Sequence, residues 1–432
     1  MKNQFCNPGL ALALFIVCGT GFAQQTQMVA LRDFNSNNTS ASSAASGSSG
    51  DASNFSFGAV SKVPIRSLLG ASGIPIYAHL MPWFGSRGHI NVGYDSAKPD
   101  QVRRQVEDMV SRGIDGAIVY WTGSSGGGNS AHTNEVAMKL MKEAERHPGF
   151  QFAIQEDKQA LEECAKRSCD LTAALTADLQ YVAKVFFNSP AYITMNGRPV
   201  LFFFGLEAYK NGINWDRIRA SVPGTPLFVF RNSVGFDYAQ SDGAFAWNAI
   251  DKLDPNDIGL KYLDHFYRVA GQHGGAVSIG SVYAGFNDRL ASWSKGRIIN
   301  SSCGDTWLKT FNVARQYLDN FAAMQLLTWN DYEEGSQIEP GIDNCVSIQA
   351  SAADDHLRWT IQGSPNTIHH FAVWVSSDNR SFRLVKELPA NARNIGFADT
   401  GLNPGQYSFV VQAVGQPSML NHNTDPISAT LP

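Results

Sequence analysis

Polar and aromatic side chains close most of the apolar runs in the first 345 residues. The last of these runs ends in six such residues in a row, Trp329 to Glu334 (WNDYEE), and three of the six are acids. The earlier positions of this kind are His79, Trp83, Tyr120, Trp121, Glu156, Asp157, Glu207, Arg231, Asn232, Trp247, Asn248 and Tyr283. The set is rich in carboxylates and aromatic rings, and it contains no Cys and no Ser–His combination.

Carboxylates and aromatic rings suit chemistry on sugars. Cleavage of a glycosidic bond needs one group that protonates the departing oxygen and a second carboxylate that activates water or supports the oxocarbenium-like centre. Aromatic faces stack on sugar rings, while Asn, Arg and His hold hydroxyl groups. The alternative for each single position is a solvated strand end or a hydrogen-bonded core residue. We expect neither a cofactor nor a metal in such a site.

Eight short apolar runs are the elements that must position these residues. Each is rich in β-branched or aromatic residues, as strands buried on both faces are. The runs are residues 74–80, 114–121, 150–157, 199–206, 226–232, 243–249, 276–284 and 324–330.

Helical patterns lie between most of these runs. In residues 99–112, Val102 and Val106 fall on one face, and Pro99 suits the first turn. Similar patterns cover residues 133–147, 171–187, 254–271 and 305–323. The alternation predicts an α/β fold, a (β/α)8 TIM barrel. A doubly wound open sheet is the alternative, but it would normally carry a glycine-rich phosphate loop, and the SSGGGN stretch at 124–129 is not one.

The active site of a (β/α)8 barrel lies at the carboxyl ends of its strands, which is where the polar and aromatic positions fall. We therefore expect one shared site there. Its expected substrate-binding residues are His79, Trp83, Trp121, Glu156, Trp247, Asn248, Tyr283, Trp329 and Asn330.

The texture of the sequence changes after Cys345. Residues 346–432 lose the helical period and show alternating runs separated by turn residues, which predicts a small all-β sandwich that folds independently. Trp359 on an early strand and the LNPGQY segment before a late strand resemble a fibronectin type III module. In that resemblance, Tyr407 is the tyrosine-corner residue.

The acidic run itself resembles two related families of glycoside hydrolases. TWNDYEEGSQIEP at residues 328–340 is similar to the N-E-W-H-E-G-T-Q-I-E motif of family 99, the retaining endo-α-mannosidases. It is also similar to W-N-D-Y-G-E of family 71, the inverting α-1,3-glucanases. The segment AHLM at residues 78–81 resembles A-H-F-M of the α-1,3-glucanases.

The resemblance implies that Asp331 and Glu334 are the two catalytic carboxylates. Glu334 is implied to protonate the leaving oxygen or to activate water. Asp331 stands where family 99 has Glu, and Glu333 stands where family 71 has Gly. The retaining family is thought to use the 2-hydroxyl of the substrate as nucleophile, and the inverting family uses water; both mechanisms stay open here. We expect Glu333 to point away and Glu339 to be a structural anchor.

The beginning of the chain resembles an export signal. Residues 1–23 contain Lys2, a short apolar run and small residues at 21–23, and we expect them to be removed on export. A lipidated Cys18 is the alternative, although Val17 stands where a small residue is wanted. Residues 24–64 are expected to form a Ser-rich flexible linker. The predicted domains are then the hydrolase-like barrel at 65–345 and the sandwich at 346–432.

Four cysteines remain after removal of residues 1–23. In an oxidising compartment their even number predicts two disulfides, Cys164–Cys169 and Cys303–Cys345. A zinc site is the alternative, but neither spacing is CxxC and no His pair accompanies them.

Composition narrows the class of function. The formal net charge is −4, which argues against a nucleic-acid-binding protein. No stretch of 18 apolar residues indicates a transmembrane helix. The sequence thus predicts a periplasmic or secreted glycoside hydrolase whose partner is an α-linked oligosaccharide or polysaccharide, of α-mannan or α-1,3-glucan type. The alternative is a catalytically inactive carbohydrate-binding or surface-adhesion protein on the same barrel.

Overall fold

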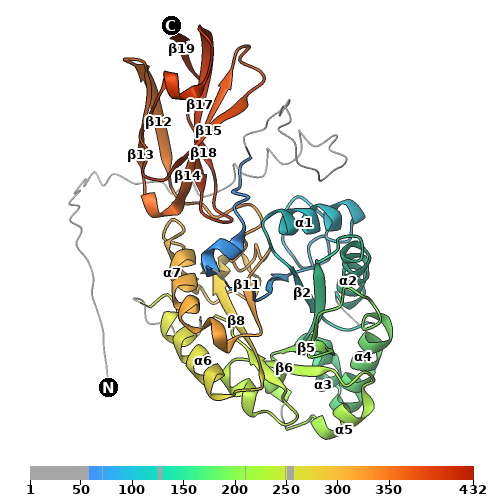
Figure 1. Ribbon diagram of the computed structural model, residues 1–432. Coiled ribbons are helices and arrows are strands. Elements are labelled where there is room, and N and C mark those ends of the chain that lie inside the picture. Colours follow the sequence, from blue (N-terminus) through green and yellow to red (C-terminus); the bar gives the residue numbers. More distant parts are fainter. Residues whose placement is uncertain (1–57, 71, 125–128, 210, 249, 251–256) are drawn as a thin grey trace, which may run out of the picture. The chain divides into compact units, whose positions relative to one another are not determined.

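The computed structural model describes residues 58–432 except 71, 125–128, 210, 249 and 251–256. The predicted export signal, and all of the predicted linker before residue 58, lie outside the described residues. The described chain forms a (β/α)8 barrel followed by an all-β module, as predicted (Figure 1).

Eight parallel strands form the closed barrel. In spatial order they are β1 (Ile76–Leu80), β2 (Gly116–Trp121), β3 (Gln151–Asp157), β5 (Arg198–Phe204), β6 (Leu227–Arg231), β7 (Gly243–Phe245), β8 (Val277–Tyr283) and β11 (Ala323–Leu327). β1 pairs with both β2 and β11, and β3 pairs with β5, so no edge is left open. All eight agree with the predicted runs to within a few residues. The short β4 (Thr194–Met195) pairs antiparallel with β5.

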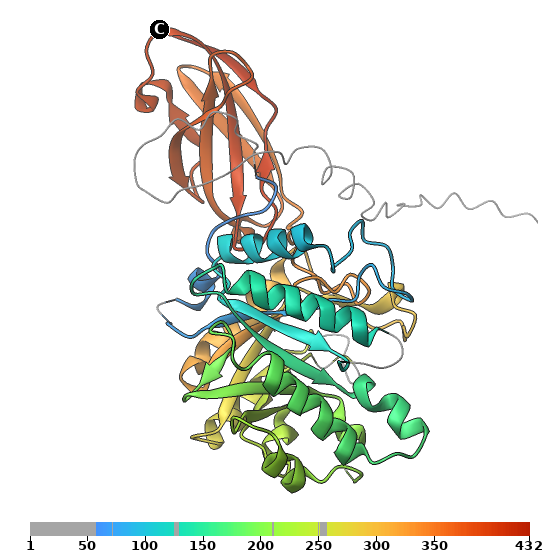
Figure 2. The same ribbon diagram turned by 90° about the vertical axis from the view of Figure 1, so that its right-hand side faces the viewer.

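Helices surround the barrel (Figures 1 and 2). They are α1 (Pro99–Ser111), α2 (Ser130–Ala144), α3 (Glu162–Lys166), α4 (Leu171–Val185), α5 (Trp215–Ser221), α6 (Leu260–Gln272) and α7 (Asp305–Ala314). α3 and α5 were not predicted, because five and seven residues are too few to show a helical period. The predicted helix at 305–323 ends its α-helical part at Ala314 and continues as a 3₁₀ helix, Arg315–Asn320.

The C-terminal module consists of antiparallel sheets. β12 (Ser347–Ala353), β13 (His356–Gln362) and β16 (Asn394–Gly396) form one sheet. The other contains β14 (Ile368–Ser376), β15 (Arg383–Pro389), β17 (Gly405–Gly415), β18 (His422–Asn423) and β19 (Ile427–Leu431). Trp359 is buried in the core of the module and packs against Phe371. The hydroxyl of Tyr407 donates to the carbonyl of Asn403 at 3.2 Å.

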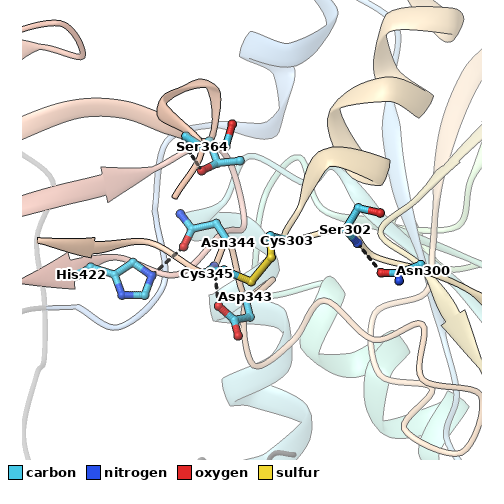
Figure 3. Close-up of a disulfide and its surroundings, with 9 residues drawn as sticks. Asn300, Ser302, Cys303, Asp343, Asn344, Cys345, Ser364 and His422 are labelled. Carbon is cyan, nitrogen blue, oxygen red and sulfur yellow. Dashed lines mark hydrogen bonds between the residues drawn. A yellow bond between two sulfur atoms is a disulfide. The ribbon is translucent and has the colours of Figure 1, made fainter. Parts of the chain in front are cut away.

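Both predicted disulfides are present. Cys164–Cys169 closes a short loop around α3. Cys303–Cys345 joins the segment before α7 to the segment before β12, and the N–H of Cys345 also donates to Asp343 at 2.8 Å (Figure 3). The second bridge therefore spans the last barrel strand and the acidic run that follows it.

The start of the described chain already makes defined contacts. Val60 pairs with Leu420, and the N–H of Ser61 donates to the carbonyl of Met419 at 2.8 Å. Val60 and Ser61 both lie in the predicted linker. Met419 is itself buried among the apolar side chains of the barrel. Across the described ranges, every helix falls short of the length and apolar character needed to span a bilayer.

Candidate active site

The acidic run forms a compact turn directly after β11. The N–H of Asp331 donates to Oγ1 of Thr328 at 2.9 Å, and the N–H of Glu334 donates to Oδ1 of Asp331 at 2.9 Å. The hydroxyls of Thr328 and Ser336 lie 3.0 Å apart and close the turn. The turn thus fixes the backbone that carries both predicted catalytic carboxylates.

Hydrogen bonds attach this turn to the end of β1. Asn330 accepts from the N–H of Met81 and donates to its carbonyl, both at 2.8 Å. The N–H of Trp329 donates to the carbonyl of His79 at 2.8 Å. Asn330 was expected to bind substrate, but its side chain is committed to this brace.

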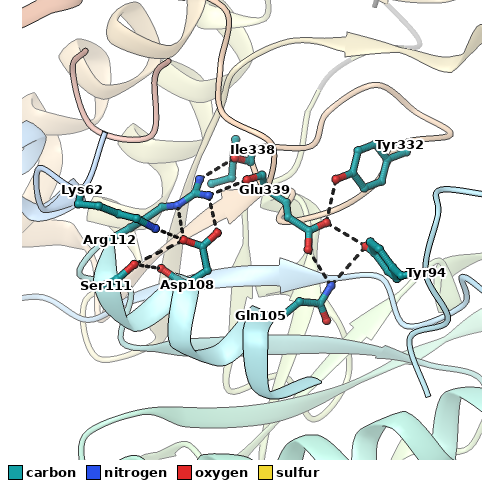
Figure 4. A network of polar contacts seen from close by, with 9 residues as sticks. All are labelled: Lys62, Tyr94, Gln105, Asp108, Ser111, Arg112, Tyr332, Ile338 and Glu339. Atoms are coloured by element: carbon teal, nitrogen blue, oxygen red, sulfur yellow. Dashed lines mark hydrogen bonds and ion pairs between the residues drawn. The ribbon is translucent and has the colours of Figure 1, made fainter. Parts of the chain in front are cut away.

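A buried network holds the far side of the turn (Figure 4). The carboxylate of Glu339 accepts from the hydroxyls of Tyr332 and Tyr94 at 2.8 and 2.9 Å and from the amide of Gln105 at 3.1 Å. Burial raises the pKa of Glu339. Arg112 donates to the carbonyl oxygens of Ile338 and Glu339, at 2.7 and 2.6 Å. Glu339 therefore anchors the turn.

Asp331 and Glu334 form an electrostatically coupled pair. Asp331 is buried, and burial together with the charge of Glu334 raises its pKa well above the ordinary value. Burial also raises the pKa of Glu334, which accepts a hydrogen bond from the indole N–H of Trp293 at 3.0 Å. Among the described residues, no ion pair includes either carboxylate. The charge of Arg297 opposes the rise at Glu334 without cancelling it. Two interacting carboxyls whose pKa values are both raised favour a state with a single shared charge.

Several buried polar groups at the strand ends lack partners within the described chain. They are both nitrogens of His79, both carboxyl oxygens of Glu156, Oδ1 of Asn248 and Nε1 of Trp83. Burial lowers the pKa of His79 to about 3 and raises that of Glu156 well above its ordinary range. Both groups are thus neutral at moderate pH, and each can donate and accept a hydrogen bond. Unpaired buried polar groups are costly to folding, and a ligand that reaches those inside the barrel would satisfy them.

Aromatic rings enclose the same region. Trp247 meets the ring of His79 edge-on at 4.8 Å. Trp83 stacks on His89 at 5.0 Å and meets Tyr120 edge-on at 4.9 Å. Burial raises the pKa of the Tyr120 hydroxyl, and the charges of Asp157, Asp331, Glu162 and Glu334 raise it further. Tyr120 therefore ties the ends of β2, β3 and β11 into one acidic cluster.

Other expected substrate-binding residues lie outside this cluster. The indole N–H of Trp121 donates to Asn134 of α2 at 3.1 Å, on the helix side of its strand. Glu156 pairs in register with Trp121, and the charge of Asp178 in α4 contributes to its raised pKa, so its side chain lies on that side too. The hydroxyl of Tyr283 donates to the carbonyl of Ile258 at 2.8 Å. Trp329 is fully buried beneath the guanidinium of Arg112. These three aromatic residues lie at or just after strand ends. Side chains alternate between the two faces of a strand, however, and these three point toward the helices or the core.

Glu207 and Glu333 are also committed to protein partners. Glu207 pairs with Arg231, next to a hollow of about 90 Å³ between α5 and the neighbouring strand ends. A larger, shallow hollow of about 680 Å³ lies at the opposite end of the barrel, beside Ile74 and Phe321. Neither hollow is lined by Asp331 or Glu334.

The described residues contain no cluster of three or more His, Cys, Asp or Glu side chains placed to hold a metal ion.

Two residues of the cluster were missed by sequence reasoning. Trp293 lies in the long loop after β8, and His89 lies in the loop after β1, six residues beyond Trp83. Neither directly follows an apolar run, so the rule that selects strand ends passes over both. The available signal was the length of the loop between residues 284 and 304, which an ordinary strand-to-helix connection does not need.

Comparisons with known proteins give structural likenesses only. No family model and no curated protein sequence matches the chain. The chain is similar to the family 99 endo-α-mannosidase of Bacteroides thetaiotaomicron in complex with bis-tris propane, with 18% identity, a TM-score of 0.49, and coverage of 61% of this chain and 86% of that one. It is also similar to a structure described as a glycoside hydrolase-like protein, with 14% identity, a TM-score of 0.48, and coverage of 62% and 86%.

Proposed function

We propose that this protein is an exported glycoside hydrolase that cleaves an α-linked glycan of α-mannan or α-1,3-glucan type. Asp331 and Glu334 are its catalytic carboxylates. The observation that carries the proposal is their placement in one turn at the carboxyl end of the barrel, where burial raises the pKa of both carboxyls and the charge of Glu334 raises that of Asp331 further. An inactive scaffold has no need to keep two such carboxyls together.

The pair divides the work of the reaction. Its raised pKa values favour a state in which one carboxyl is ionised and the other retains a proton. The motif resemblance assigns proton donation to the leaving oxygen to Glu334. Asp331 then acts as the base, on the 2-hydroxyl of the substrate in a retaining mechanism or on water in an inverting one.

The unpartnered groups around the pair bind the sugar. His79 offers both hydrogen-bonding directions, which matches a hydroxyl group that donates and accepts. Asn248 adds an acceptor and Trp83 a donor. Trp247 and Trp83 supply apolar walls. Such a site binds a neutral polyol more readily than an anion, because its titratable groups are acids and a histidine that resists protonation.

Export is part of the proposal. Two disulfides are typical of proteins that fold in an oxidising compartment, and they support the signal-like segment at residues 1–23. The mature protein then works in the periplasm or outside the cell.

A hydrolysis panel tests the proposal. Oligosaccharides of α-1,3-glucose and of α-1,2-, α-1,3- and α-1,6-mannose are incubated with the protein and with Glu334→Gln, and proton NMR follows the first anomer released. We expect cleavage of one linkage class by the wild type alone. Binding of a glycan to both proteins, with hydrolysis by neither, would instead establish the inactive carbohydrate-binding alternative.

A further inference from the structure

The loop that carries Trp293 is hydrogen-bonded to the turn that carries Asp331 and Glu334. It starts with β9 (Phe286–Asn287), continues through a 3₁₀ turn (Asp288–Leu290) and ends with β10 (Ile298–Ile299), which pairs back to β9. The N–H of Asn287 donates to the carbonyl of Glu334 at 2.6 Å. A Cβ on Gly335 would lie 2.9 Å from the carbonyl oxygen of Asn287, so only glycine allows this approach. The loop and the turn therefore form one unit.

Asp288 makes the loop rigid from within. Its carboxylate accepts from the hydroxyl of Ser294 at 3.1 Å, from the N–H groups of Lys295 and Arg297 at 3.1 and 2.9 Å, and from the side chain of Arg297 at 2.8 Å. Desolvation alone would raise the pKa of Asp288, but these hydrogen bonds outweigh it and lower the pKa to about 2. The segment that contains Trp293 is thus closed around a permanently charged carboxylate.

This rigid loop exposes apolar side chains beside the carboxylate pair. Leu290, Trp293 and Ile298 are 65%, 41% and 43% exposed, and they are three of the six large apolar side chains that the described residues leave exposed. The ring of Trp293 meets Trp83 and His89 edge-on, with centroids 6.3 and 6.2 Å away. The rigid loop holds this exposed indole beside Glu334, so its ring face is available to bind a ligand of the carboxylate pair.

We propose that Trp293 stacks on the sugar at the leaving-group side of the glycan and, through its indole N–H, positions the carboxyl of Glu334. This inference rests on the proposed function. A general acid lies next to the oxygen that it protonates, so a ring hydrogen-bonded to that acid lies beside the departing sugar. The substrate is then a glycan with at least one further sugar beyond the cleaved bond.

The hydrogen bond has an electrostatic consequence. A donor to the ionised form of an acid favours that form, so the indole N–H opposes the rise that burial produces in the pKa of Glu334. The other charged or titratable groups that act on Glu334 are Arg297 and Asp288 of the same loop, Asp331 and Glu333 of the turn, and Tyr120 of β2. None of these is altered when the ring of Trp293 is exchanged for another aromatic ring.

The first experiment needs no substrate. The protein is labelled with ¹⁵N-tryptophan, the indole signal of Trp293 is identified by its loss in Trp293→Phe, and its shift is followed with pH. We expect a titration that disappears in Glu334→Gln and persists in Leu290→Ala. A Trp293 signal that does not titrate, or that titrates unchanged in Glu334→Gln, would overturn the coupling even if the protein hydrolyses no glycan.

The second experiment compares two leaving groups on the substrate class found active in the hydrolysis panel. One substrate is the cleaved oligosaccharide, and the other is the α-glycosyl fluoride of the same sugar, which has no sugar on the leaving side. Trp293→Ala should raise KM for the oligosaccharide about tenfold and leave kcat/KM for the fluoride within about twofold. Trp293→Phe should keep the oligosaccharide KM and move the basic limb of its pH profile up by about one pH unit.

Leu290→Ala is the matched control, because Leu290 is an apolar residue of the same loop and is 65% exposed. It should leave both substrates and the pH profile unchanged. Equal losses on the two substrates in Trp293→Ala would overturn the stacking role, and so would a Leu290→Ala variant that matches Trp293→Ala.

Discussion

His89 and Glu333 contact each other directly at the edge of the turn that carries Asp331 and Glu334. Nδ1 of His89 lies 2.8 Å from one carboxyl oxygen of Glu333, and the other oxygen accepts from the N–H of Ile90 at 3.0 Å. Because the ring of His89 also stacks on Trp83, the pair fixes an aromatic wall of the site. The third acid of the run is therefore committed to the loop after β1 and does not join the pair of Asp331 and Glu334.

Replacement of Glu333 should weaken the fold more than the chemistry. We expect Glu333→Gln to keep turnover within a few-fold of wild type and to lower the free energy of unfolding by about 1–2 kcal/mol, since one charge-assisted hydrogen bond is lost in a buried place. Urea denaturation measures the change, with Glu135→Gln on the exposed face of α2 as the control. If the stability of Glu333→Gln equals that of wild type, the pairing with His89 contributes nothing.

Replacement of either member of the catalytic pair should stop the reaction without unfolding the protein. Glu334→Gln and Asp331→Asn preserve side-chain size but cannot exchange a proton, and general acid–base assistance is worth about 100- to 10,000-fold. Initial rates on the active glycan, together with circular dichroism, test this. An active Glu334→Gln beside an inactive Glu333→Gln would show that the catalytic assignment is shifted by one residue.

Asp157 should make the protein less stable as the pH rises. Burial raises its folded-state pKa from an ordinary 3.8 to about 7, so the folded protein holds a proton that the unfolded chain releases. Its contribution to stability is complete below about pH 4 and is lost as the pH climbs to about 7. That loss is at most about 4 kcal/mol, because one pKa unit corresponds to about 1.4 kcal/mol. Asp157→Asn should therefore gain on wild type over this range in urea midpoints.

Asp170 provides the opposite control for that experiment. It also accepts from backbone N–H groups at a helix start, but its hydrogen bond from Ala173 lowers its pKa. Asp170→Asn should therefore lose relative to wild type as the pH rises to about 4, and should run parallel to wild type between about pH 4 and 7. If Asp157→Asn also runs parallel to wild type between about pH 4 and 7, Asp157 does not titrate in that window.

The two disulfides should differ in their contribution to stability. They close loops with sequence separations of 42 and 5 residues, for which chain entropy predicts about 4 and about 2 kcal/mol respectively. We expect Cys303→Ser/Cys345→Ser to lower the urea midpoint more than Cys164→Ser/Cys169→Ser. The reverse order would mean that the longer loop retains structure after unfolding.

The sequence predicts the scaffold well because strand burial is a local signal. The eight strands and most of the long helices follow from apolar runs and periodicity, and both disulfides follow from cysteine number and spacing. The site is predicted less well because it depends on which way a side chain points. Trp121 and His79 both end a strand, yet the first faces α2 and the second faces the barrel.

The missed residues show the same limit in the opposite direction. Trp293 and His89 reach the carboxylates from loops whose path is set by contacts distant in sequence, such as Asn287 with Glu334 and His89 with Glu333. No periodicity announces such contacts. The motif resemblance pointed to Asp331 and Glu334, but it gave no sign of their neighbours.

The hydrogen bonds between Asn330 and Met81 have a consequence for when the carboxylate pair is assembled during folding. The two residues are 249 positions apart, and both of their hydrogen bonds require β1 and β11 to be side by side. Contacts of such long range form late in folding, because the intervening chain must first be ordered. In a chain whose barrel is still incomplete, the turn that carries Asp331 and Glu334 is not yet held in place. The carboxylate pair is therefore assembled only when the barrel has closed, and any activity that depends on the pair begins with the completed fold.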